Sequence, residues 1–299
     1  MNKIFIIGSS NTDMVIKLDQ LPLPGETRMG GNFFMNAGGK GANQAVAAAR
    51  MGGEILFVTK IGEDIFGKQA LEGFAKEGID TKYVFTDFRH ASGTALILVN
   101  DMGENCIAVA PGANAALLPA DIDKVSELDT AEIILMQLEI PLETVYHVAS
   151  KIKGKPVKLV INPAPAQKLD DTLLDGLFLV TPNETEAKTL TGISVSDEQS
   201  ASEAAEFLLK KGVQHVIITL GSGGAYFQDK ERKFKMDAPL VQAVDTTAAG
   251  DIFNGALVVA LTENLDWEKA IGFAIHAASL SVTRLGAQSS APYRREVNG

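Results

Sequence analysis

Short apolar runs alternate with longer amphipathic segments along most of the chain. The run Lys3–Gly8 is β-branched and apolar and ends at a glycine, which is typical of a buried first strand. Further strand-like runs follow at Ile55–Thr59, Ile133–Gln137, Val157–Ile161, Phe178–Val180 and Val216–Thr219. Helical patterns lie between most of them, at Gly41–Met51, Gly67–Glu77, Leu142–Ile152, Ser202–Lys211 and Trp267–Arg284. This alternation predicts a three-layer α/β fold with a mostly parallel sheet and helices on both faces.

Two stretches break this alternation. Residues 14–35 and 92–110 read as extended, turn-punctuated strands without a crossover helix, with a hairpin turn at Asp101–Gly103. They predict a small β-sheet that acts as a lid. One face of such a sheet needs a cover, and a second subunit could supply it, so we expect a homodimer through the lid. Because no repeat or linker is visible, the prediction is one domain over residues 1–299.

Composition narrows the possible partners and sites. The chain has 299 residues, 46% hydrophobic residues and a net charge of −10, which argues against a nucleic-acid surface. Its single cysteine, Cys106, excludes an internal disulfide and is predicted to be a small buried strand residue. The four histidines lack metal-ligand spacing. No signal-peptide pattern is present, and the apolar run Ala256–Leu261 is too short to cross a membrane, so we expect a cytoplasmic protein.

The segment Asp245–Gly255 carries the strongest candidate chemistry. Small residues at 248–250 leave the N–H groups at a helix start uncovered, which suits an anion. During phosphoryl transfer, charge spreads over the moving phosphate oxygens, and preorganised N–H donors match that charge. Asp251 lies beside this pocket and could accept the proton of an attacking hydroxyl. The structural alternative is that Asp251 caps the helix.

Asn11 and Asp13 come directly after the first strand. In open α/β sheets, ligands bind beyond the carboxyl ends of the strands. An Asp and an Asn at this place can accept from and donate to neighbouring sugar hydroxyls. An Asx turn that leaves the strand is the alternative.

The glycine-rich loop 38–43 opens a helix without forming a P-loop, because Lys40 is followed by Gly41 instead of Ser or Thr. Its glycines would let the backbone approach a small ligand closely, with Asn43 pointing inward. A loop that leads into a helix and carries a surface lysine is the alternative.

Two further segments suit a nucleotide and its metal. Asn183 and Glu186 lie three residues apart in a first helical turn, and Mg²⁺ needs few protein carboxylates besides phosphate oxygens. The alternative is a helix start with Pro182 followed by a capping Asn183. The glycine-rich turn Thr219–Gly224 offers backbone N–H groups to phosphates, although such turns are common between strands.

Taken together and in this order, these segments resemble the ribokinase branch of the PfkB carbohydrate kinase family, from the first strand to about Tyr293. The loop Gly-Gly-Lys-Gly-Ala-Asn-Gln-Ala (38–45) and the run Ala-Pro-Gly-Ala-Asn-Ala-Ala (110–116) look like that branch in particular. The resemblance implies a Rossmann-like α/β fold with Asp251 as the catalytic base and an anion hole from Ala248, Ala249 and Gly250. It implies sugar contacts from Asn11, Asp13, Gly39, Lys40, Asn43, Glu139 and Asp251. It implies nucleotide contacts from Asn183, Thr219, Leu220, Gly221, Ser222, Gly223, Gly224 and Gly250.

The resemblance also implies ATP as co-substrate, Mg²⁺ held indirectly through Glu186, and a monovalent cation, usually K⁺, beside the anion hole. The positions that match the K⁺ site are Asp245, Thr247, Ser281, Arg284, Gly286 and Ser290. One departure affects the nucleotide side. The family often has Asn where this chain has Ile275, followed by His276, so the adenine contact there is expected to be apolar or shifted.

The implied reaction transfers the γ-phosphoryl group of ATP to the 5-hydroxyl of D-ribose and gives ribose 5-phosphate and ADP. A deoxyribose, nucleoside or other pentose kinase remains an alternative, because residues that bind a diol do not identify the sugar. A non-catalytic sugar sensor with the same fold is an alternative from another class, against which the intact Asp251 and its anion hole weigh. A nucleotide-binding structural subunit is a third, although it would not need the loop at 38–43.

Overall fold

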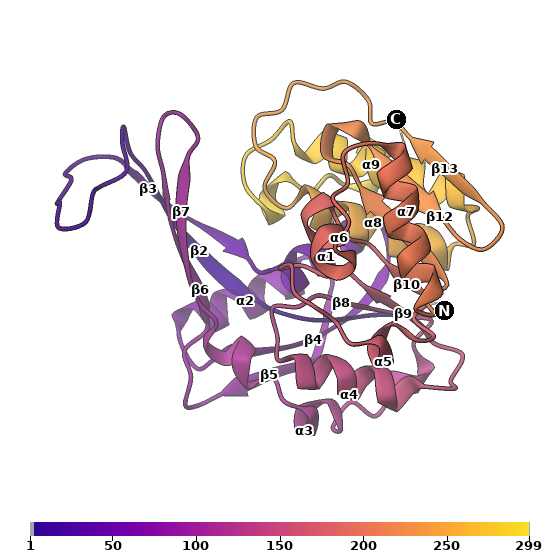
Figure 1. The fold of residues 1–299 in the computed structure, drawn as a ribbon. Coiled ribbons are helices and arrows are strands. Elements are labelled where there is room, and N and C mark those ends of the chain that lie inside the picture. Colours follow the sequence, from indigo (N-terminus) through magenta and orange to yellow (C-terminus); the bar gives the residue numbers. More distant parts are fainter. Residues whose placement is uncertain (1–2, 299) are drawn as a thin grey trace.

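The computed structural model describes residues 3–298, and these residues form two sheets (Figure 1). The main sheet has nine strands in the order β13-β12-β11-β10-β9-β8-β1-β4-β5. Their bounds are β1 (Lys3–Ile7), β4 (Glu54–Gly62), β5 (Asp80–Asp87), β8 (Ile133–Met136), β9 (Lys158–Ile161), β10 (Leu179–Val180), β11 (His215–Thr219), β12 (Ala225–Gln228) and β13 (Lys233–Met236). The strands from β5 to β11 pair in parallel, whereas β12 pairs antiparallel with both β11 and β13.

Helices cover both faces of the main sheet, because its strands send alternate side chains into two cores. In β1, Ile4 and Ile6 belong to one core, and Phe5 and Ile7 belong to the other. Helices that contribute to the first core are α1 (Lys40–Arg50), α2 (Ile65–Lys76), α8 (Ala249–Thr262), α9 (Trp267–Ser281) and α10 (Arg294–Val297). Helices that contribute to the second are α3 (Pro119–Ile122), α4 (Leu142–Ile152), α5 (Asp171–Leu174), α6 (Glu184–Thr191) and α7 (Glu198–Lys210). The predicted three-layer α/β fold is confirmed.

The sequence pattern missed several elements at the edges of the main sheet. Strand β5 is an edge strand that keeps only part of its side chains buried, so its apolar alternation is weak. The short antiparallel pair β12–β13 forms the other edge. Helix α9 ends at Ser281, three residues before the predicted end at Arg284. The carbonyl of Val282 there accepts hydrogen bonds from the N–H groups of residues 244 and 245, at 2.7 and 3.1 Å.

The small sheet consists of β2, β3, β6 and β7 and projects from the main body at the left of Figure 1. Its strands are β2 (Asn11–Lys17), β3 (Asn32–Gly38), β6 (Gly93–Val99) and β7 (Asn105–Ala110), in the order β3-β2-β6-β7. The expected β-segments at 14–35 and 92–110 thus supply these strands. The predicted hairpin turn at 101–103 joins β6 to β7 and is closed by a 3.0 Å bond from Asn100 N to the carbonyl of Glu104.

The register of the small sheet places two apolar rows on one face, which we call the outer face. One row is Met35–Met14–Leu96–Ala108 and the next is Phe33–Ile16–Leu98–Cys106. Phe33 is 60% exposed and Leu96 56% exposed, so among the described residues nothing covers this face fully. The prediction that Cys106 is buried was wrong. Cys106 does lie in a strand, but that strand is at the edge of the small sheet and Cys106 is exposed on its outer face.

Close backbone packing places α1 against the carboxyl end of β1. A Cβ atom on Gly41 would lie 2.6 Å from the carbonyl carbon of Gly8, so no larger residue fits without a shift of the helix. Gly39 precedes the helix with φ of 86°, a left-handed conformation that favours glycine. These glycines bring the first turn of α1 to the edge of the sheet where β1 gives way to β2.

Candidate active site

The predicted site residues converge at one edge of the main sheet, because most of them follow the carboxyl end of a parallel strand. β1 leads through Gly8 into Asn11 and Asp13, and β8 leads into Glu139. β10 leads into Asn183 and β11 into the turn at 219–224. Helices α1 and α8 pack on each other over this edge, and they carry the remaining candidates.

Asp251 lies in the first turn of α8 with 5% of its surface exposed. Its Oδ2 accepts a hydrogen bond from Nδ2 of Asn43 at 2.9 Å, and its Oδ1 accepts one from Nε2 of Gln44 at 3.0 Å. The N-cap of α8 is Ala248, and no side chain caps the helix. The helix-cap alternative for Asp251 is therefore wrong, since its carboxylate is turned across to α1.

The backbone before Asp251 forms a tight turn. Ala248 has φ of 61°, which is unusual for a non-glycine residue, and the N–H of Ala249 makes a long bond of 3.3 Å to Thr246 O. By position, the N–H groups of Gly250 and Asp251 have no acceptor within the helix. The carbonyl of Gly250 accepts from Nδ2 of Asn254 at 2.8 Å, and this bond ties the turn to the buried helix. The predicted anion hole thus has the geometry of a helix start that can bind an anion.

One lysine lies among the carboxylates of this edge. The pKa of Lys40 is raised, chiefly by the negative charge of Asp251 and further by Glu139, Glu186 and Asp13, while burial opposes the rise. Burial raises the pKa of Asp251, and Lys40, Asn43 and Gln44 act against this rise. The alternative of a surface lysine for Lys40 does not hold, because the side chain is largely buried and its charge interacts with acidic side chains of the site.

The sugar-side candidates lie between the sheet edge and the small sheet. Glu139 Oε2 accepts from Ser9 Oγ at 2.6 Å and from the backbone N of Lys40 at 3.0 Å, which fixes it beside the loop that opens α1. Asn11 Oδ1 accepts from Nδ2 of Asn114 at 2.7 Å, so the Asx-turn alternative is wrong. Asn114 also binds the backbone of Ser10 at both its N–H and its carbonyl.

Asp13 faces a cleft of about 570 Å³ between the small sheet and the loops around residues 245 and 286. Burial, with added repulsion from Glu139 and Asp251, raises the pKa of Asp13 to about 6. A Cβ atom on Gly38 would lie 2.2 Å from Oδ2 of Asp13, so the neighbouring strand has glycine where the carboxylate lies. Gly38 thus leaves room for the carboxylate of Asp13 at the wall of the cleft.

Asn183 and Glu186 form a reciprocal cap at the start of α6. Asn183 Oδ1 accepts from the N–H of Glu186 at 2.8 Å, and Glu186 Oε2 accepts from the N–H of Asn183, also at 2.8 Å. The capping alternative is thus present. The cap does not exclude a role for Glu186 near Mg²⁺. The side chain of Glu186 is buried, and burial raises the pKa of its carboxyl group. Within residues 3–298, no three His, Cys, Asp or Glu side chains gather to hold a metal ion by themselves.

The predicted nucleotide turn follows β11 as the short 3₁₀ turn η3 (Gly221–Gly223). Gly224 has φ of 87°, and a Cβ there would lie 2.0 Å from the carbonyl oxygen of Met236, so this position needs glycine. On α9, Ile275 is buried in the core and His276 is exposed. The other short turns are η1 (Gly112–Ala116), η2 (Leu128–Thr130) and η4 (Gln288–Ser290).

Three of the positions matched to a K⁺ site come together at Asp245. Its carboxylate accepts from the N–H of Thr247 at 2.9 Å and from the N–H of Gly286 at 2.8 Å. Ser281 and Ser290 are buried, and each donates its hydroxyl to a backbone carbonyl three residues earlier. The Arg284 side chain pairs with Glu296 at 2.7 Å, so only its backbone is available for a cation.

The family model described as pfkB family carbohydrate kinase matches residues 1–294. The chain belongs to this family. A ribokinase of Haemophilus influenzae is 46% identical over 292 residues, which cover 97% of this chain and 95% of the relative. A deoxyribokinase of Salmonella typhi is 39% identical and covers 99% of this chain and 97% of its own. The structure of Arabidopsis thaliana ribokinase complexed with ribose and ATP has a TM-score of 0.93 at 33% identity, covering 99% of this chain and 97% of its own.

The resemblance to the ribokinase branch of the pfkB family is thereby confirmed, as is the Rossmann-like fold with its second, small sheet. None of the helices within the described range 3–298 is long and apolar enough to cross a membrane.

In this pfkB-family chain, sequence reasoning missed the buried polar residues behind Asp251, which are Gln44, Gln137, Asn162, Thr181 and Asn254. Gln44 stands in the glycine-rich loop motif, next to Asn43, within an alanine-rich helix. Such a polar residue on an otherwise apolar helix is a signal that could have identified it. Asn162, directly after β9, carries the same kind of signal as Asn11 after β1.

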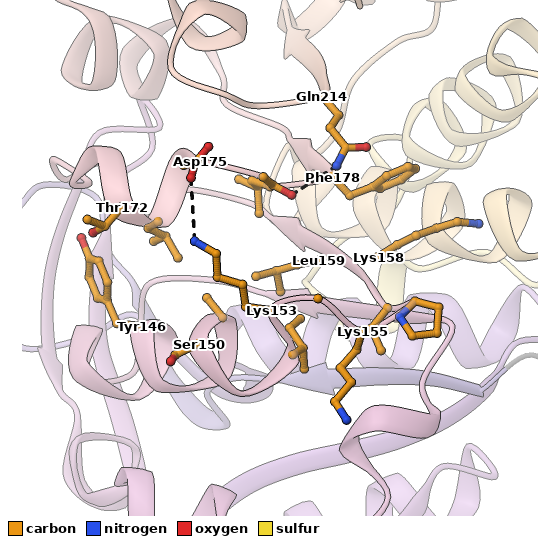
Figure 2. A pocket seen from close by; sticks show the side chains of 18 residues that line it. Tyr146, Ser150, Lys153, Lys155, Lys158, Leu159, Thr172, Asp175, Phe178 and Gln214 are labelled. Carbon is orange, nitrogen blue, oxygen red and sulfur yellow. Dashed lines mark hydrogen bonds and ion pairs between the residues drawn. The ribbon is translucent and has the colours of Figure 1, made fainter.

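A separate pocket of about 900 Å³ lies beside α4 and the loops that precede β9 and β10, as Figure 2 shows. Its lysines lie near carboxylates, with Lys153 Nζ 3.8 Å from Asp175 Oδ2 and Lys158 Nζ 3.3 Å from Glu132 Oε1. Because it adjoins the amino ends of these strands, it lies away from the edge where the pfkB-family site residues gather.

Proposed function

We propose that this member of the pfkB family is an ATP-dependent kinase that phosphorylates D-ribose at its 5-hydroxyl and releases ribose 5-phosphate and ADP. The observation that carries the proposal is the buried carboxylate of Asp251. It lies at the open N-terminus of α8 and accepts a hydrogen bond from Asn43 of α1, and its negative charge raises the pKa of Lys40. Ribokinases among the relatives, with 46% identity to one of them, support ribose as the acceptor.

The sugar would be bound by Asn11, Asp13, Gly39, Lys40, Asn43 and Glu139. Asn43 supports this role, because its Oδ1 is buried and has no hydrogen-bond partner among the described residues, although its Nδ2 donates to Asp251. A buried acceptor without a partner costs stability unless a ligand satisfies it. A sugar hydroxyl that donates to this oxygen would lie next to Asp251.

Asp251 would act as the general base. Its carboxylate takes the proton of the 5-hydroxyl as the oxygen attacks the γ-phosphorus, the bond to the β-phosphate oxygen breaks, and ADP leaves. The raised pKa of Asp251, caused chiefly by burial, brings it closer to that of a base which works near neutral pH. The N–H groups at 249–251 would stabilise the charge that spreads over the transferred phosphoryl oxygens.

ATP would bind across Asn183 and the turn Thr219–Gly224, with its γ-phosphate toward the anion hole at Ala248–Gly250. The negative charges of Asp251, Glu139, Glu186 and Asp13 all act on Lys40, so the charge balance of this region favours a further cation. Mg²⁺, when bound, would neutralise phosphate charge, and Glu186 would hold it indirectly, through water. The sparse protein ligands fit Mg²⁺, which takes most of its ligands from phosphate oxygens and water.

A monovalent cation, expected to be K⁺, would bind near Asp245. Hydrogen bonds from Thr247 and Gly286 hold the pKa of Asp245 below its ordinary value although burial opposes this, so a carboxylate charge is present. The remaining positions, Ser281, Arg284 and Ser290, would contribute backbone carbonyl oxygens.

The small sheet would serve as the lid of a single domain over residues 1–299. Its inner face lines the cleft through Asp13, and closure would exclude water from the γ-phosphate. Its apolar outer face would pair with a second copy and form a homodimer in the cytoplasm.

An ADP-release assay across D-ribose, 2-deoxyribose, adenosine and fructose tests this function. We expect the highest kcat/KM with D-ribose, at saturating MgATP. Faster turnover of 2-deoxyribose would identify a deoxyribokinase, an alternative that the 39% identity to a relative of that name keeps in view. If none of the four compounds caused ADP release, the result would contradict the proposal and favour a non-catalytic sensor.

A further inference from the structure

Gln44 connects Asp251 with buried amides from two other strand ends. It lies one residue after Asn43 on α1, and its side chain is fully buried. Its Nε2 donates to Oδ1 of Asp251 and to Oδ1 of Asn162, both at 3.0 Å. Its Oε1 accepts from Nε2 of Gln137. Both N–H bonds and the oxygen of the Gln44 amide are therefore occupied.

The direction of this hydrogen-bond chain is set at its far end by a backbone carbonyl. Asn162 Nδ2 donates to the carbonyl oxygen of Thr181 at 3.0 Å, and a carbonyl oxygen can only accept. Asn162 Oδ1 must then face Gln44, and Gln44 must present its N–H groups to Asp251. A reversed Gln44 amide would place its oxygen against two other acceptor oxygens, which is unfavourable.

The direction of the hydrogen-bond chain leaves one buried oxygen of Gln137 without a partner. Its Nε2 donates to Gln44, but its Oε1 is buried and has no hydrogen-bond partner within the described part of the chain. That oxygen occupies the space beside Gly8, where a Cβ atom would lie 2.1 Å from it. A buried acceptor without a partner is unfavourable, but a reversed Gln137 amide would place its oxygen against Oε1 of Gln44, so the direction of the Gln44 amide sets that of Gln137.

We infer that Gln44 is a positioning residue for the phosphoryl-transfer reaction, and that it holds Asp251 with its carboxylate turned to accept the sugar proton. The inference rests on the proposed function, in which Asp251 is the base. Asn43 binds the other carboxylate oxygen, but Asn43 is also expected to bind the sugar. The other hydrogen bonds of Gln44 go to Gln137 and Asn162 at the strand ends, and Gln44 is not among the residues expected to bind the sugar, so we expect its bond to Asp251 to persist when the substrate enters.

The charged groups that interact with Asp251 determine how its pKa would respond to the loss of the hydrogen bond from Gln44. Lys40 favours the ionised carboxylate, while Glu139 disfavours it, and Asp13 and Glu186 also interact electrostatically with Asp251. Burial raises the pKa of Asp251, and the donors on Asn43 and Gln44 lower it. Without the Gln44 donor, the acid limb of the rate profile should move to higher pH.

The test compares three variants with the wild-type enzyme by pH profiles of kcat at saturating ribose and MgATP. Gln44→Met keeps the side-chain volume and removes the donor, and Gln44→Glu keeps the shape and adds a second carboxylate beside Asp251. Asn162→Leu leaves Gln44 in place but removes the group that orients it. Thr144→Val is the matched control, since Thr144 is fully buried and donates to Leu117 O at 2.7 Å, far from the site.

For Gln44→Met we expect kcat to fall about tenfold or more, the loss of one hydrogen bond to a charged group. The acid limb should rise by about one pH unit, further in Gln44→Glu, while the KM for ribose stays within about twofold. Asn162→Leu should show a smaller shift of the same sign, and it decides the question if the Gln44 variants do not fold. An unshifted acid limb in every folded variant, with Asp251→Asn inactive, would overturn this inference and leave the base in place. An active Asp251→Asn would instead overturn the proposed base.

Discussion

The floor of the site, by which we mean Asp251 and the buried amides of Asn43, Gln44 and Asn162, differs from the small sheet in how far its groups find partners within one chain. On the floor, Asp251 is buried, and its two carboxylate oxygens accept from amides of α1. The amides behind it continue through Asn162 to Thr181, which in turn donates to Asn254 at 2.6 Å. On the small sheet, two apolar rows are open to solvent across four strands.

This difference suggests that the floor carries the chemical step and that the small sheet closes the site. On the floor, each buried polar side chain makes at least one hydrogen bond to another group of the core, although Oδ1 of Asn43 and Oε1 of Gln137 have no partner among the described residues. The small sheet has a polar inner edge at Asp13 but an outer face that needs another surface. We therefore expect changes on the floor to act on kcat and changes on the small sheet to act on sugar affinity and assembly.

The largest effect is expected from Asp251→Asn. The variant keeps the shape of the side chain but cannot take a proton, so kcat should fall by a factor on the order of 10² or more, with ribose binding retained. Steady-state kinetics and ribose titration by calorimetry measure the two quantities separately. The matched control is Asp266→Asn, because Asp266 caps α9 and shows what a purely structural aspartate does. Near-normal turnover of Asp251→Asn would remove Asp251 from the chemistry.

The floor and the small sheet also differ in how far the sequence predicted them. Strand and helix periods predicted the three layers, and residues after strand ends predicted Asn11, Asp13 and Asn183, because the carboxyl ends of parallel strands meet at one edge. The partners of Asp251 could not be predicted in the same way. Gln44 and Asn162 are 118 positions apart, and their contact depends on the packing of α1 over β9.

Edge strands gave the weakest sequence signals. Cys106 lies in an apolar strand and was expected to be buried, because apolar alternation does not show whether a face has a partner. The same limit holds for the whole outer face, whose pattern is that of a core strand. Sequence periodicity thus identified the small sheet but not which of its faces one chain covers.

The second effect concerns Asp13, which faces the cleft from the small sheet. Asp13→Asn should lower kcat/KM for ribose about 10- to 100-fold, because a hydrogen bond to a charged group is lost. The variant should also be more stable at neutral pH. The pKa of Asp13 is about 6 in the folded protein and near 3.8 in the unfolded chain. The contribution of Asp13 to stability is therefore fully present below pH 3.8, and it is lost as the pH rises through 6 and the buried carboxyl group ionises.

Thermal unfolding between pH 4 and 7.5 measures this linkage. The stability advantage of Asp13→Asn should be on the order of 2 kcal/mol at pH 7 and should shrink toward pH 4. Asp19→Asn is the control, since the Asp19 side chain is 75% exposed in the loop after β2. An advantage that does not change with pH would contradict the burial of the Asp13 charge.

The third effect tests whether a second copy covers the outer face. Leu96→Lys places a charge in the middle of the row Met35–Met14–Leu96–Ala108, and it should convert a dimer to a monomer and raise the KM for ribose several-fold with kcat less affected. Light scattering after size exclusion measures the mass. Leu118→Lys, at the N-terminus of α3 and 41% exposed, is the matched control. A wild-type protein that is already monomeric would leave the outer face to another partner.

The smallest effect is expected from the monovalent cation, because it would act on the anion hole only through the loop at Asp245. Replacing K⁺ with tetramethylammonium at equal ionic strength should lower kcat a few-fold and leave the oligomeric state unchanged. Asp245→Asn should have the same low activity in both salts, since the charge that attracts the cation is gone while the side chain can still accept from Gly286 N. A wild-type enzyme that ignores every monovalent ion would dismiss this site. A response that also changed the mass would show that floor and small sheet are coupled, contrary to the separation argued above.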